Sequence, residues 1–262
     1  MMYENLIYEI QEGICTITLN RPAVYNALNP ELIQEITKAF IQSGEDASVR
    51  VVVLTGTGDN AFSSGADLKN GLGGMSSLGE SLRKNYNPMI LSIRNLAKPV
   101  ICKLNGVAAG AGCSLALACD VIIASETARM SQIFVNIGLI IDAGSSYFLP
   151  RLLGSQKAFE LASTGRIVEA QECFELGLVN KVVPANELDK VVSETALMYA
   201  QGATQAIGLI KKVLNQSYHS TLEEMLELEA ENQDKAGKTP DFIEGVTAFL
   251  QKRKASFKGF TM

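Results

Sequence analysis

Short runs of β-branched and aliphatic residues recur along the first half of the chain, at residues 14–19, 51–55, 100–104 and 121–124. The last three runs are almost unbroken in hydrophobicity, which is typical of strands that are covered on both faces of a sheet. Helical segments separate these runs, and such alternation predicts parallel strands joined by right-handed crossovers. The pattern therefore predicts an α/β fold.

The start of one crossover helix is visible in the sequence itself. Asn29 is a favourable N-cap residue, Pro30 suits the first helical position, and Glu31 adds an early acidic side chain. Apolar residues then recur at helical spacing: Leu32, Ile33, Ile36, Ala39 and Phe40.

The pattern changes near residue 186, after which no further strand is expected. Four helices are predicted there, over residues 186–202, 204–215, 221–236 and 240–257. Their apolar stripes have few neighbours in the sequence to cover them, so we expect packing on the core or on another subunit. The chain is thus divided into an α/β core with the binding site, residues 1–185, and a helical oligomerisation region, residues 186–262.

Composition narrows the class of protein. The chain has 262 residues, 47% of them hydrophobic, and a net charge of −5, which excludes a disordered protein and argues against nucleic acid as the main partner. The N-terminus lacks the basic start and apolar run of a secretory signal, so a cytoplasmic enzyme is expected. The longest apolar stretch, residues 106–124, contains Asp120 and several Gly, which favours a buried helix and a core strand over a membrane span.

Cysteine and histidine usage limits the chemistry further. The five Cys form no Cys-x-x-Cys pair, and an odd number without a secretory signal predicts reduced, mostly buried thiols. His219 is the only histidine, so no metal site is expected. Its place in the helical tail predicts a surface or helix-end residue.

Two segments rich in Gly and Ala, residues 62–69 and 106–114, each follow a predicted strand. Ligand crevices form at the carboxyl ends of parallel strands, and small residues let a substrate approach backbone N–H groups. Two converging N–H groups would stabilise an oxyanion, with a helix N-terminus aimed at the same place. Tight packing of helices and strands would explain the small residues equally well, and neither segment matches a phosphate loop or a dinucleotide fingerprint.

The segment of residues 71–79 is also rich in Gly and Ser. We predict a mobile loop over the site there, with residues 71–96 shaping the pocket for a substrate.

Several motifs follow one another in a recognisable order. They are Asn-Arg-Pro at 20–22, Asn-Ala-Leu at 26–28, Phe-Ser-Ser-Gly-Ala-Asp-Leu at 62–68, the segment 106–114 with Ala-Cys-Asp at 118–120, and the stretches 165–184 and 249–254. Across nearly its whole length the chain resembles the crotonase (enoyl-CoA hydratase/isomerase) family. The resemblance implies a spiral core of ββα repeats, a helical trimerisation region and trimers that often pair into hexamers.

The resemblance also implies an acyl-CoA substrate and no separate cofactor, because CoA is part of the substrate. The backbone N–H groups of Ala66 and Ala111 would form the oxyanion hole; the family usually has Gly at the second position, but Ala keeps the N–H. Six residues would line the CoA channel, chiefly through backbone atoms: Ala23, Val24, Ala27, Ser64, Asp67 and Leu68.

Two C-terminal residues complete the implied CoA site. Phe249 and Lys252 would reach the CoA adenine and phosphates, often across a subunit boundary. Phosphate attraction to Lys supports this interpretation of the basic residues 252–254, although a solvated helix end would also explain them.

Hydration in this family normally uses two carboxylates, and the matching positions here are Ser114 and Phe134. The absence of carboxylates at these two positions argues against an efficient hydratase. One acid lies nearby, Asp142, which an N-cap role would also explain. The surrounding sequence, with Gly-Leu-Ile-Ile-Asp-Ala-Gly at 138–144, resembles the isomerase branch, including epoxyphenylacetyl-CoA isomerases, which implies that Asp142 is the acid/base.

The sequence therefore predicts an isomerase that shifts a β,γ double bond to α,β through an enolate. A hydratase, a thioesterase and a decarboxylase remain alternatives, as does a non-catalytic acyl-CoA- or RNA-binding protein. A protease using Ser114 is disfavoured, because the sole potential histidine base, His219, lies in the helical tail.

Overall fold

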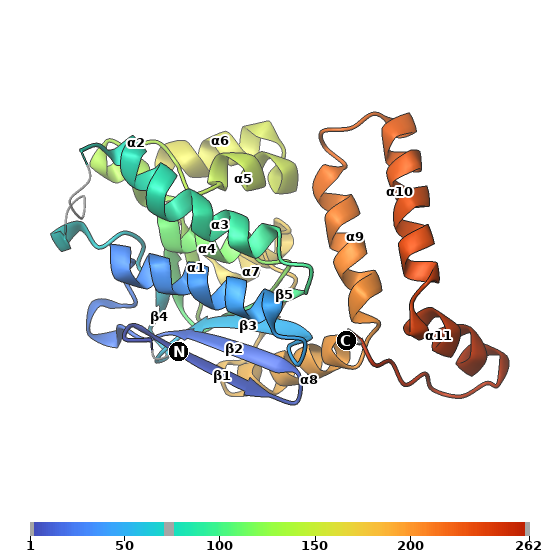
Figure 1. Ribbon diagram of the computed structural model, residues 1–262. Coiled ribbons are helices and arrows are strands. Elements are labelled where there is room, and N and C mark those ends of the chain that lie inside the picture. Colours follow the sequence, from blue (N-terminus) through green and yellow to red (C-terminus); the bar gives the residue numbers. More distant parts are fainter. Residues whose placement is uncertain (1–2, 71–75, 260–262) are drawn as a thin grey trace.

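The computed structural model describes residues 3–70 and 76–259, which form two β-sheets surrounded by helices (Figure 1). The larger sheet has six strands in the order β1 (Leu6–Gln11), β2 (Ile14–Leu19), β3 (Val51–Gly56), β5 (Val100–Leu104), β7 (Val121–Ser125) and β10 (Lys181–Val183). The smaller sheet has four strands in the order β4 (Ala61–Ser63), β6 (Val107–Ala109), β8 (Arg129–Ser131) and β9 (Ile167–Glu169).

The two sheets are built by one repeated unit. In the pairs β3–β4, β5–β6 and β7–β8, the first strand joins the larger sheet and the second joins the smaller sheet. The helices after these pairs include α3 (Asn87–Arg94), α4 (Ala111–Leu117) and α5 (Ser145–Leu153). From β2 to β10 the larger sheet is parallel, and only β1 pairs antiparallel with β2. The predicted α/β spiral of ββα repeats is confirmed.

The larger sheet is covered on both faces, which explains the unbroken apolar runs. Val52 and Leu54 of β3 belong to the main core, into which α1 (Pro30–Glu45) and α3 also pack their apolar faces. Val51 and Val53 point to the opposite face and pack with residues of α8 (Leu188–Ala200). Alternate side chains of one strand therefore fill two separate cores.

The predicted start of α1 is confirmed. The side-chain oxygen of Asn29 accepts a hydrogen bond of 3.0 Å from the backbone N–H of Leu32, and Pro30 is the first helical residue. The other short helical segments are α2 (Leu78–Ser81), α6 (Ser155–Thr164), α7 (Ala170–Glu175), the 3₁₀ turns Pro22–Val24, Leu68–Asn70, Ile133–Ile137 and Ala185–Glu187, and the π-helical turn Leu82–Tyr86.

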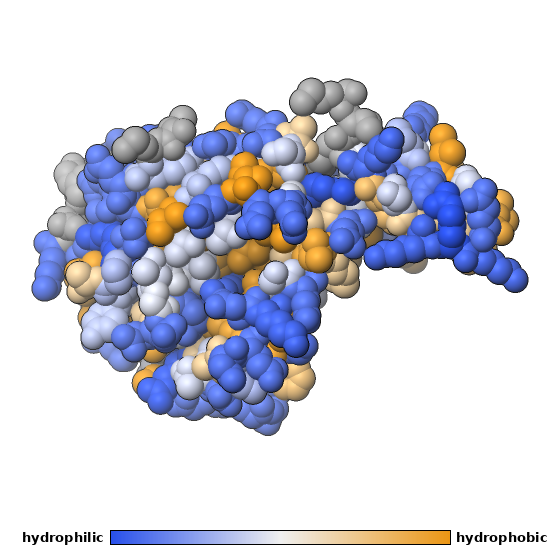
Figure 2. All heavy atoms as spheres, turned by 90° about the horizontal axis from the view of Figure 1, so that it is seen from below, coloured by the Kyte–Doolittle hydropathy of each residue, from blue (hydrophilic) through white to orange (hydrophobic). Residues whose placement is uncertain are grey.

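Three C-terminal helices form an arm that projects from the sheets, namely α9 (Thr204–Gln216), α10 (Leu222–Gly237) and α11 (Pro240–Leu250) (Figure 1). Seen from below, the arm stands away from the body and leaves a concave edge between them (Figure 2). Many large apolar side chains of the arm are exposed: Ile210, Leu214, Leu222, Leu226, Phe242, Ile243, Val246, Phe249 and Leu250.

The prediction of a last helix over residues 240–257 was wrong at its C-terminal end. The helix stops at Leu250, because Lys252 adopts the left-handed conformation (φ 54°). The N–H of Lys252 then donates to the carbonyl of Phe249 (3.1 Å), and that of Arg253 donates to Ala248 (3.0 Å). These bonds cap the last helical carbonyls and turn the chain away.

The structure also tests the expectations for the Cys residues, for His219 and for the loop at residues 71–79. All five Cys are buried and free, as predicted. His219 is exposed after α9, where its Nε2 lies 3.2 Å from the hydroxyl of Tyr147, so the surface position is also confirmed. Residues 71–75 of the predicted loop lie outside the described residues, and the chain is helical again from Leu78. None of the described helices is both long and apolar enough to cross a bilayer.

Candidate active site

The two Gly-rich segments lie against each other, as the sequence predicted. Strand β4 overlaps the start of the first segment and β6 lies near the start of the second, and the two strands are parallel neighbours. A Cβ added to Gly65 would lie 2.6 Å from the carbonyl oxygen of Ala109 and 3.4 Å from the amide nitrogen of Ala111. Gly65 also has φ +90°, a conformation that glycine adopts without strain. Only glycine at position 65 allows the backbone before Ala66 to approach Ala111 so closely.

The N–H groups of Ala66 and Ala111 are both available. The neighbours of Ala66 are engaged, since Leu28 donates to the carbonyl of Gly65 (2.8 Å) and Asp67 donates to the carbonyl of Leu28 (3.0 Å). Ala111 is the first residue of α4, where helical N–H groups have no partner within the helix. Within residues 3–70 and 76–259, neither N–H donates a hydrogen bond. Two free donors therefore flank the close approach at Gly65.

The segment of residues 21–28 is fastened to β4 by Asn26. Its buried side-chain amide accepts a hydrogen bond from the N–H of Arg21 (3.0 Å) and donates to the carbonyl of Ala61 (2.9 Å). The hydroxyl of Ser63 donates to the carbonyl of Asn26 (2.8 Å), and the N–H of Ser64 donates to the carbonyl of Tyr25 (3.0 Å). The Asn-Ala-Leu motif thus holds one predicted wall of the CoA channel against the other.

The six residues predicted to line that channel lie in these two connected segments. Ala23 and Leu68 are exposed, Val24, Ser64 and Asp67 are half-buried, and Ala27 is buried. The carboxylate of Asp67 forms a 2.9 Å ion pair with Arg21, which also donates to the carbonyl of Ala27 (2.6 Å). The side chain of Asp67 is therefore engaged within the protein, which leaves backbone atoms as its means of contact with a ligand.

Asp142 lies beside helix α4. Ser114, one turn after the start of α4, donates a 3.0 Å hydrogen bond to the backbone carbonyl of Asp142. One carboxyl oxygen of Asp142 is buried and has no hydrogen-bond partner among the described residues. Burial raises the pKa of this carboxyl from 3.8 to about 6. A group with this pKa is deprotonated at neutral pH yet can still carry a proton, as an acid/base requires.

The alternative N-cap role of Asp142 does not fit the structure. Helix α5 begins at Ser145, and its N-cap position is Gly144 with no side-chain cap, so Asp142 lies two residues before the N-cap. The residue between them, Ala143, has φ 48°, an uncommon conformation for a residue with a Cβ. The tight turn at these residues leaves the buried carboxyl oxygen of Asp142 without a hydrogen-bond partner among the described residues.

The wall beside the oxyanion-hole segment is apolar. Phe134 is buried. A Cβ atom added to Gly110 would lie 3.9 Å from its ring, which is an ordinary van der Waals distance. Ser114 is fully buried, and its hydroxyl is engaged in hydrogen bonds within the protein. The two positions at which the resemblance implies carboxylates in a hydratase thus hold a phenyl ring and a hydroxyl group that is already bonded.

Tyr86 was not predicted as a site residue. It ends the π-helical turn Leu82–Tyr86 and is buried. Burial raises the pKa of its phenol, and the negative charges of Asp142 and Asp67 add to that effect. Its hydroxyl therefore lies in the field of both carboxylates. π-Helical turns are frequent at functional sites, but they leave no clear signal in the sequence.

Phe249 and Lys252 do not join the site within one chain. They lie on and just after α11, on the opposite side of the molecule from β4 and the start of α1 (Figure 1). Phe249 is 83% exposed. Of the basic residues that follow, Arg253 is already paired with Glu244 (2.6 Å), whereas Lys252 is exposed.

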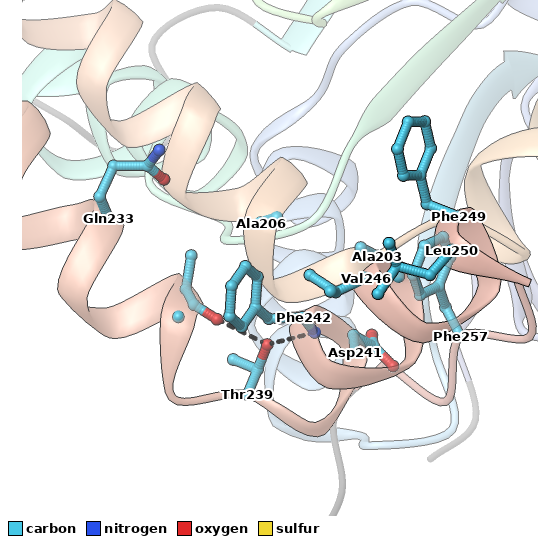
Figure 3. A pocket seen from close by; sticks show the side chains of 13 residues that line it. Ala203, Ala206, Gln233, Thr239, Asp241, Phe242, Val246, Phe249, Leu250 and Phe257 are labelled. Carbon is cyan, nitrogen blue, oxygen red and sulfur yellow. Dashed lines mark hydrogen bonds between the residues drawn. The ribbon is translucent and has the colours of Figure 1, made fainter.

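The arm has a cavity of its own, of about 640 Å³, beside α11 (Figure 3). Phe242, Val246 and Leu250 contribute apolar walls, and Thr239 closes the start of α11 by accepting from the N–H of Phe242 (3.2 Å). Neither Asp142 nor the oxyanion-hole residues line this cavity. It belongs to the arm and is separate from the candidate active site.

No cluster of metal ligands was found within the described part of the chain. The candidate site offers two backbone amides, of Ala66 and Ala111, as donors and the carboxylate of Asp142 as an acceptor. This arrangement suits proton transfer next to a stabilised oxyanion.

Comparison with known proteins agrees with the fold. The family described as Enoyl-CoA hydratase/isomerase matches residues 9–260. The chain is 37% identical to the 1,2-epoxyphenylacetyl-CoA isomerase of Escherichia coli strain K12, over 98% of this chain and 100% of that protein. It is 40% identical to a protein of Rhodobacter capsulatus named probable enoyl-CoA hydratase, over 99% of this chain and 100% of that protein.

A solved structure gives the same result. The crystal structure of enoyl-CoA hydratase from Bacillus anthracis superimposes with a TM-score of 0.92 at 35% identity, covering 98% of this chain and 100% of that chain. The two-sheet spiral is therefore the crotonase fold, the fold of a class of enzymes that act on acyl-CoA thioesters. The chain belongs to the enoyl-CoA hydratase/isomerase family.

Proposed function

We propose that this enzyme is an enoyl-CoA isomerase that moves a β,γ double bond to the α,β position, with Asp142 as the acid/base. The observation that carries the proposal is a half-buried carboxyl group beside the helix that begins at Ala111. Its pKa is raised to about 6, and its buried oxygen has no hydrogen-bond partner among the described residues. No second carboxylate occupies the positions of Ser114 and Phe134.

The proposed reaction moves one proton and conserves all atoms. The carboxylate of Asp142 removes a proton from the α carbon, and the electrons of that bond form the dienolate. The negative charge that develops on the thioester oxygen accepts hydrogen bonds from the N–H groups of Ala66 and Ala111. Asp142 then returns the proton to the γ carbon, so that the carbonyl reforms and the double bond lies between the α and β carbons.

Hydration is the second candidate, because relatives at 35% and 40% identity carry hydratase names. Addition of water needs a group that holds and deprotonates the water. The hydroxyl of Ser114 is already committed to hydrogen bonds within the protein, and Phe134 presents only a ring. These two residues favour isomerisation over hydration.

We further propose that CoA lies along the channel of residues 23–28 and 64–68 and that a homotrimer, or a hexamer of paired trimers, completes the site. The arm exposes a broad apolar surface, which a neighbouring subunit would bury. In such an assembly, Phe249 and Lys252 of one subunit would contact the CoA bound by another. This would explain why both side chains are exposed and distant from the site of their own chain.

The test is to supply a β,γ-enoyl-CoA and, separately, an α,β-enoyl-CoA to the wild type, to D142N and to D59N. Asp59 is an exposed carboxylate outside the site and serves as a matched control. Formation of the conjugated product is followed by ultraviolet absorbance, and water addition is followed by mass. We expect conjugation by the wild type and D59N, and a loss of about 10²–10⁴-fold in kcat for D142N.

The pH dependence provides a second measure of the same base. Because Asp142 must be deprotonated to act, kcat/KM of the wild type should fall as the pH drops below about 6, the pKa of its carboxyl. Efficient hydration that is indifferent to D142N would show that the proposed function is wrong.

A further inference from the structure

Asp142 is held in place by its backbone rather than by its side chain. The carbonyl oxygen of Asp142 accepts two hydrogen bonds, one from the hydroxyl of Ser114 (3.0 Å) and one from the N–H of Ser145 (3.0 Å). The hydroxyls of Ser114 and Ser145 lie 2.7 Å apart, and the side-chain amide of Gln132 donates to Ser145 (2.9 Å). All three of these partner side chains are buried.

The direction of this chain of hydrogen bonds follows from the number of protons available. A hydroxyl has one proton to donate. The hydroxyl of Ser145 accepts from Gln132, and Ser114 is its only acceptor among the described residues. The hydroxyl of Ser114 then has two carbonyl oxygens as acceptors, that of Asp142 at 3.0 Å and that of Gly110 at 3.3 Å, and the shorter bond is the one to Asp142. The chain therefore runs from Gln132 through both serines to the backbone of Asp142, and each bond polarises the next.

This chain connects the three structural elements that meet at the site. Ser114 lies on α4, whose first residue is Ala111; Ser145 is the first residue of α5; and Gln132 precedes the turn that carries Phe134. The N–H of Gly110 also donates to the carbonyl of Ser131 (2.9 Å), next to Gln132. One buried network thus fixes the turn that carries the carboxylate relative to the helix that carries an oxyanion-hole amide.

We propose that Ser114, Ser145 and Gln132 are positioning residues, which hold the carboxylate of Asp142 at a fixed place relative to the amide of Ala111 without touching the substrate. The inference rests on the proposed function only for its kinetic consequence. Its structural consequence is that the network keeps the Asp142 turn, with its left-handed Ala143, packed in the protein instead of open to water.

Two variants break the network at different points, S114A and S145A. Each removes one hydroxyl from a buried site, so either remains informative if the other fails to fold. S43A is the matched control, because Ser43 is also fully buried and donates a 2.8 Å hydrogen bond to the carbonyl of Ala39, within α1 and away from the site. A general loss of a buried serine hydrogen bond would affect all three variants alike.

The kinetic measurement is kcat and KM with a β,γ-enoyl-CoA. A displacement of a catalytic group by about 1 Å can cost on the order of 100-fold in rate. We therefore expect S114A and S145A to lower kcat by about 10- to 100-fold with little change in KM, whereas S43A stays within about twofold of the wild type.

The second measurement needs no activity. Thermal midpoints are compared between pH 4 and pH 8 for the wild type and D142N, and then for S114A and the double variant S114A/D142N. If the network keeps the carboxylate out of water, D142N raises the midpoint at pH 8 in the wild-type background. That gain should shrink in the S114A background, where the freed turn lets the carboxylate reach water.

The inference requires both results. A kcat for S114A and S145A equal to that of S43A overturns it, and so does an unchanged gain from D142N in the S114A background. If the wild type does not isomerise β,γ-enoyl-CoA at all, the proposed function is wrong, and the thermal comparison alone decides whether the network positions Asp142. Tyr86, whose phenol lies in the field of Asp142, is unchanged in every variant, so it does not contribute to differences between their thermal midpoints.

Discussion

The carboxyl group of Asp142 is more easily protonated in the folded protein than in the unfolded chain. Burial raises its pKa from 3.8 to about 6, and no neighbouring cation in the described ranges offsets this effect. The folded state therefore binds more protons than the unfolded state between these two pH values. Stability falls as the pH rises through that window, and the penalty is complete above about pH 6.

D142N should consequently stabilise the protein at pH 8 and change little at or below pH 4. The shift of the pKa, discounted for partial exposure to solvent, corresponds to about 1–2 kcal/mol. For a chain of this length, that is a rise of about 2–4 °C in the melting temperature at pH 8. Thermal denaturation at both pH values checks the prediction, and a rise of the same size at pH 4 would contradict the assigned cause.

At the scale of single residues, the sequence predicted the proposed catalytic groups and missed the side chains that hold them in place. Asp142, Ala66 and Ala111 follow from the resemblance and from the small residues around them. Gln132 and Ser145 carry no such signal, because their role depends on contacts between segments far apart in the sequence. In the sequence, Ser114 mattered only because the resemblance implies a carboxylate at this position in a hydratase. In the structure, its hydroxyl donates a hydrogen bond to the backbone of the Asp142 turn.

Among elements, β2, β3, β5 and β7 were predicted with nearly the right bounds, because runs of β-branched and aliphatic residues mark them, whereas the six-residue strand β1 was not predicted. The strands β4, β6, β8, β9 and β10 have three residues each, too few to show a period of two. They could be placed only through the resemblance. The end of α11 was missed because no Gly or Pro stands directly after Leu250, and Lys252 supplies the left-handed turn instead.

The contact between β4 and α4 gives a prediction at the same scale. A Cβ at Gly112 would lie 2.4 Å from the carbonyl oxygen of Ser63, which is backbone and cannot rotate away. We expect G112A to push α4 from β4, to destabilise the protein by about 1–3 kcal/mol, and to lower kcat because the amides of Ala66 and Ala111 no longer converge. Denaturant unfolding and steady-state kinetics measure the two effects.

G237A is the control for that substitution. Gly237 ends α10, and a Cβ there would meet no atom within 4 Å. Its backbone is helical, so alanine should be neutral or slightly stabilising. If G112A and G237A have the same stability and the same kcat, the close approach at Gly112 does not shape the site.

For the whole molecule, the arm is the feature that a single chain does not explain. L226D places a charge on its exposed apolar surface, where Leu226 is 56% exposed on α10. We expect the wild type to have about three or six times the 28.2 kDa mass of the chain in solution and L226D to have less. KM for the CoA thioester should rise at least about tenfold in L226D, because Phe249 and Lys252 would no longer reach a neighbouring site. Light scattering and kinetics test both expectations.

E227D, an exchange at the adjacent exposed position, should leave both mass and KM unchanged. A monomeric wild type with an ordinary KM would refute the shared site, and an L226D protein of unaltered mass would place the subunit contact elsewhere. The apolar stripes on the arm could be predicted from the sequence, but the surface that covers them could not. The spacing of apolar residues indicates that a helix face is buried, and it does not indicate what packs against that face.

The solitary carboxylate of Asp142 has a consequence for the choice of substrate. We expect a site with one anion, an apolar wall at Phe134 and no cation that offsets the raised pKa of Asp142 among the described residues to disfavour acyl chains that end in a carboxylate. Two like charges roughly 6 Å apart repel by about 3 kcal/mol at the dielectric constant typical of a protein surface. Uncharged hydrocarbon or aromatic acyl groups avoid this repulsion. If Asp142 is the base that we propose, its isolation should also make the enzyme favour monocarboxylic over dicarboxylic thioesters.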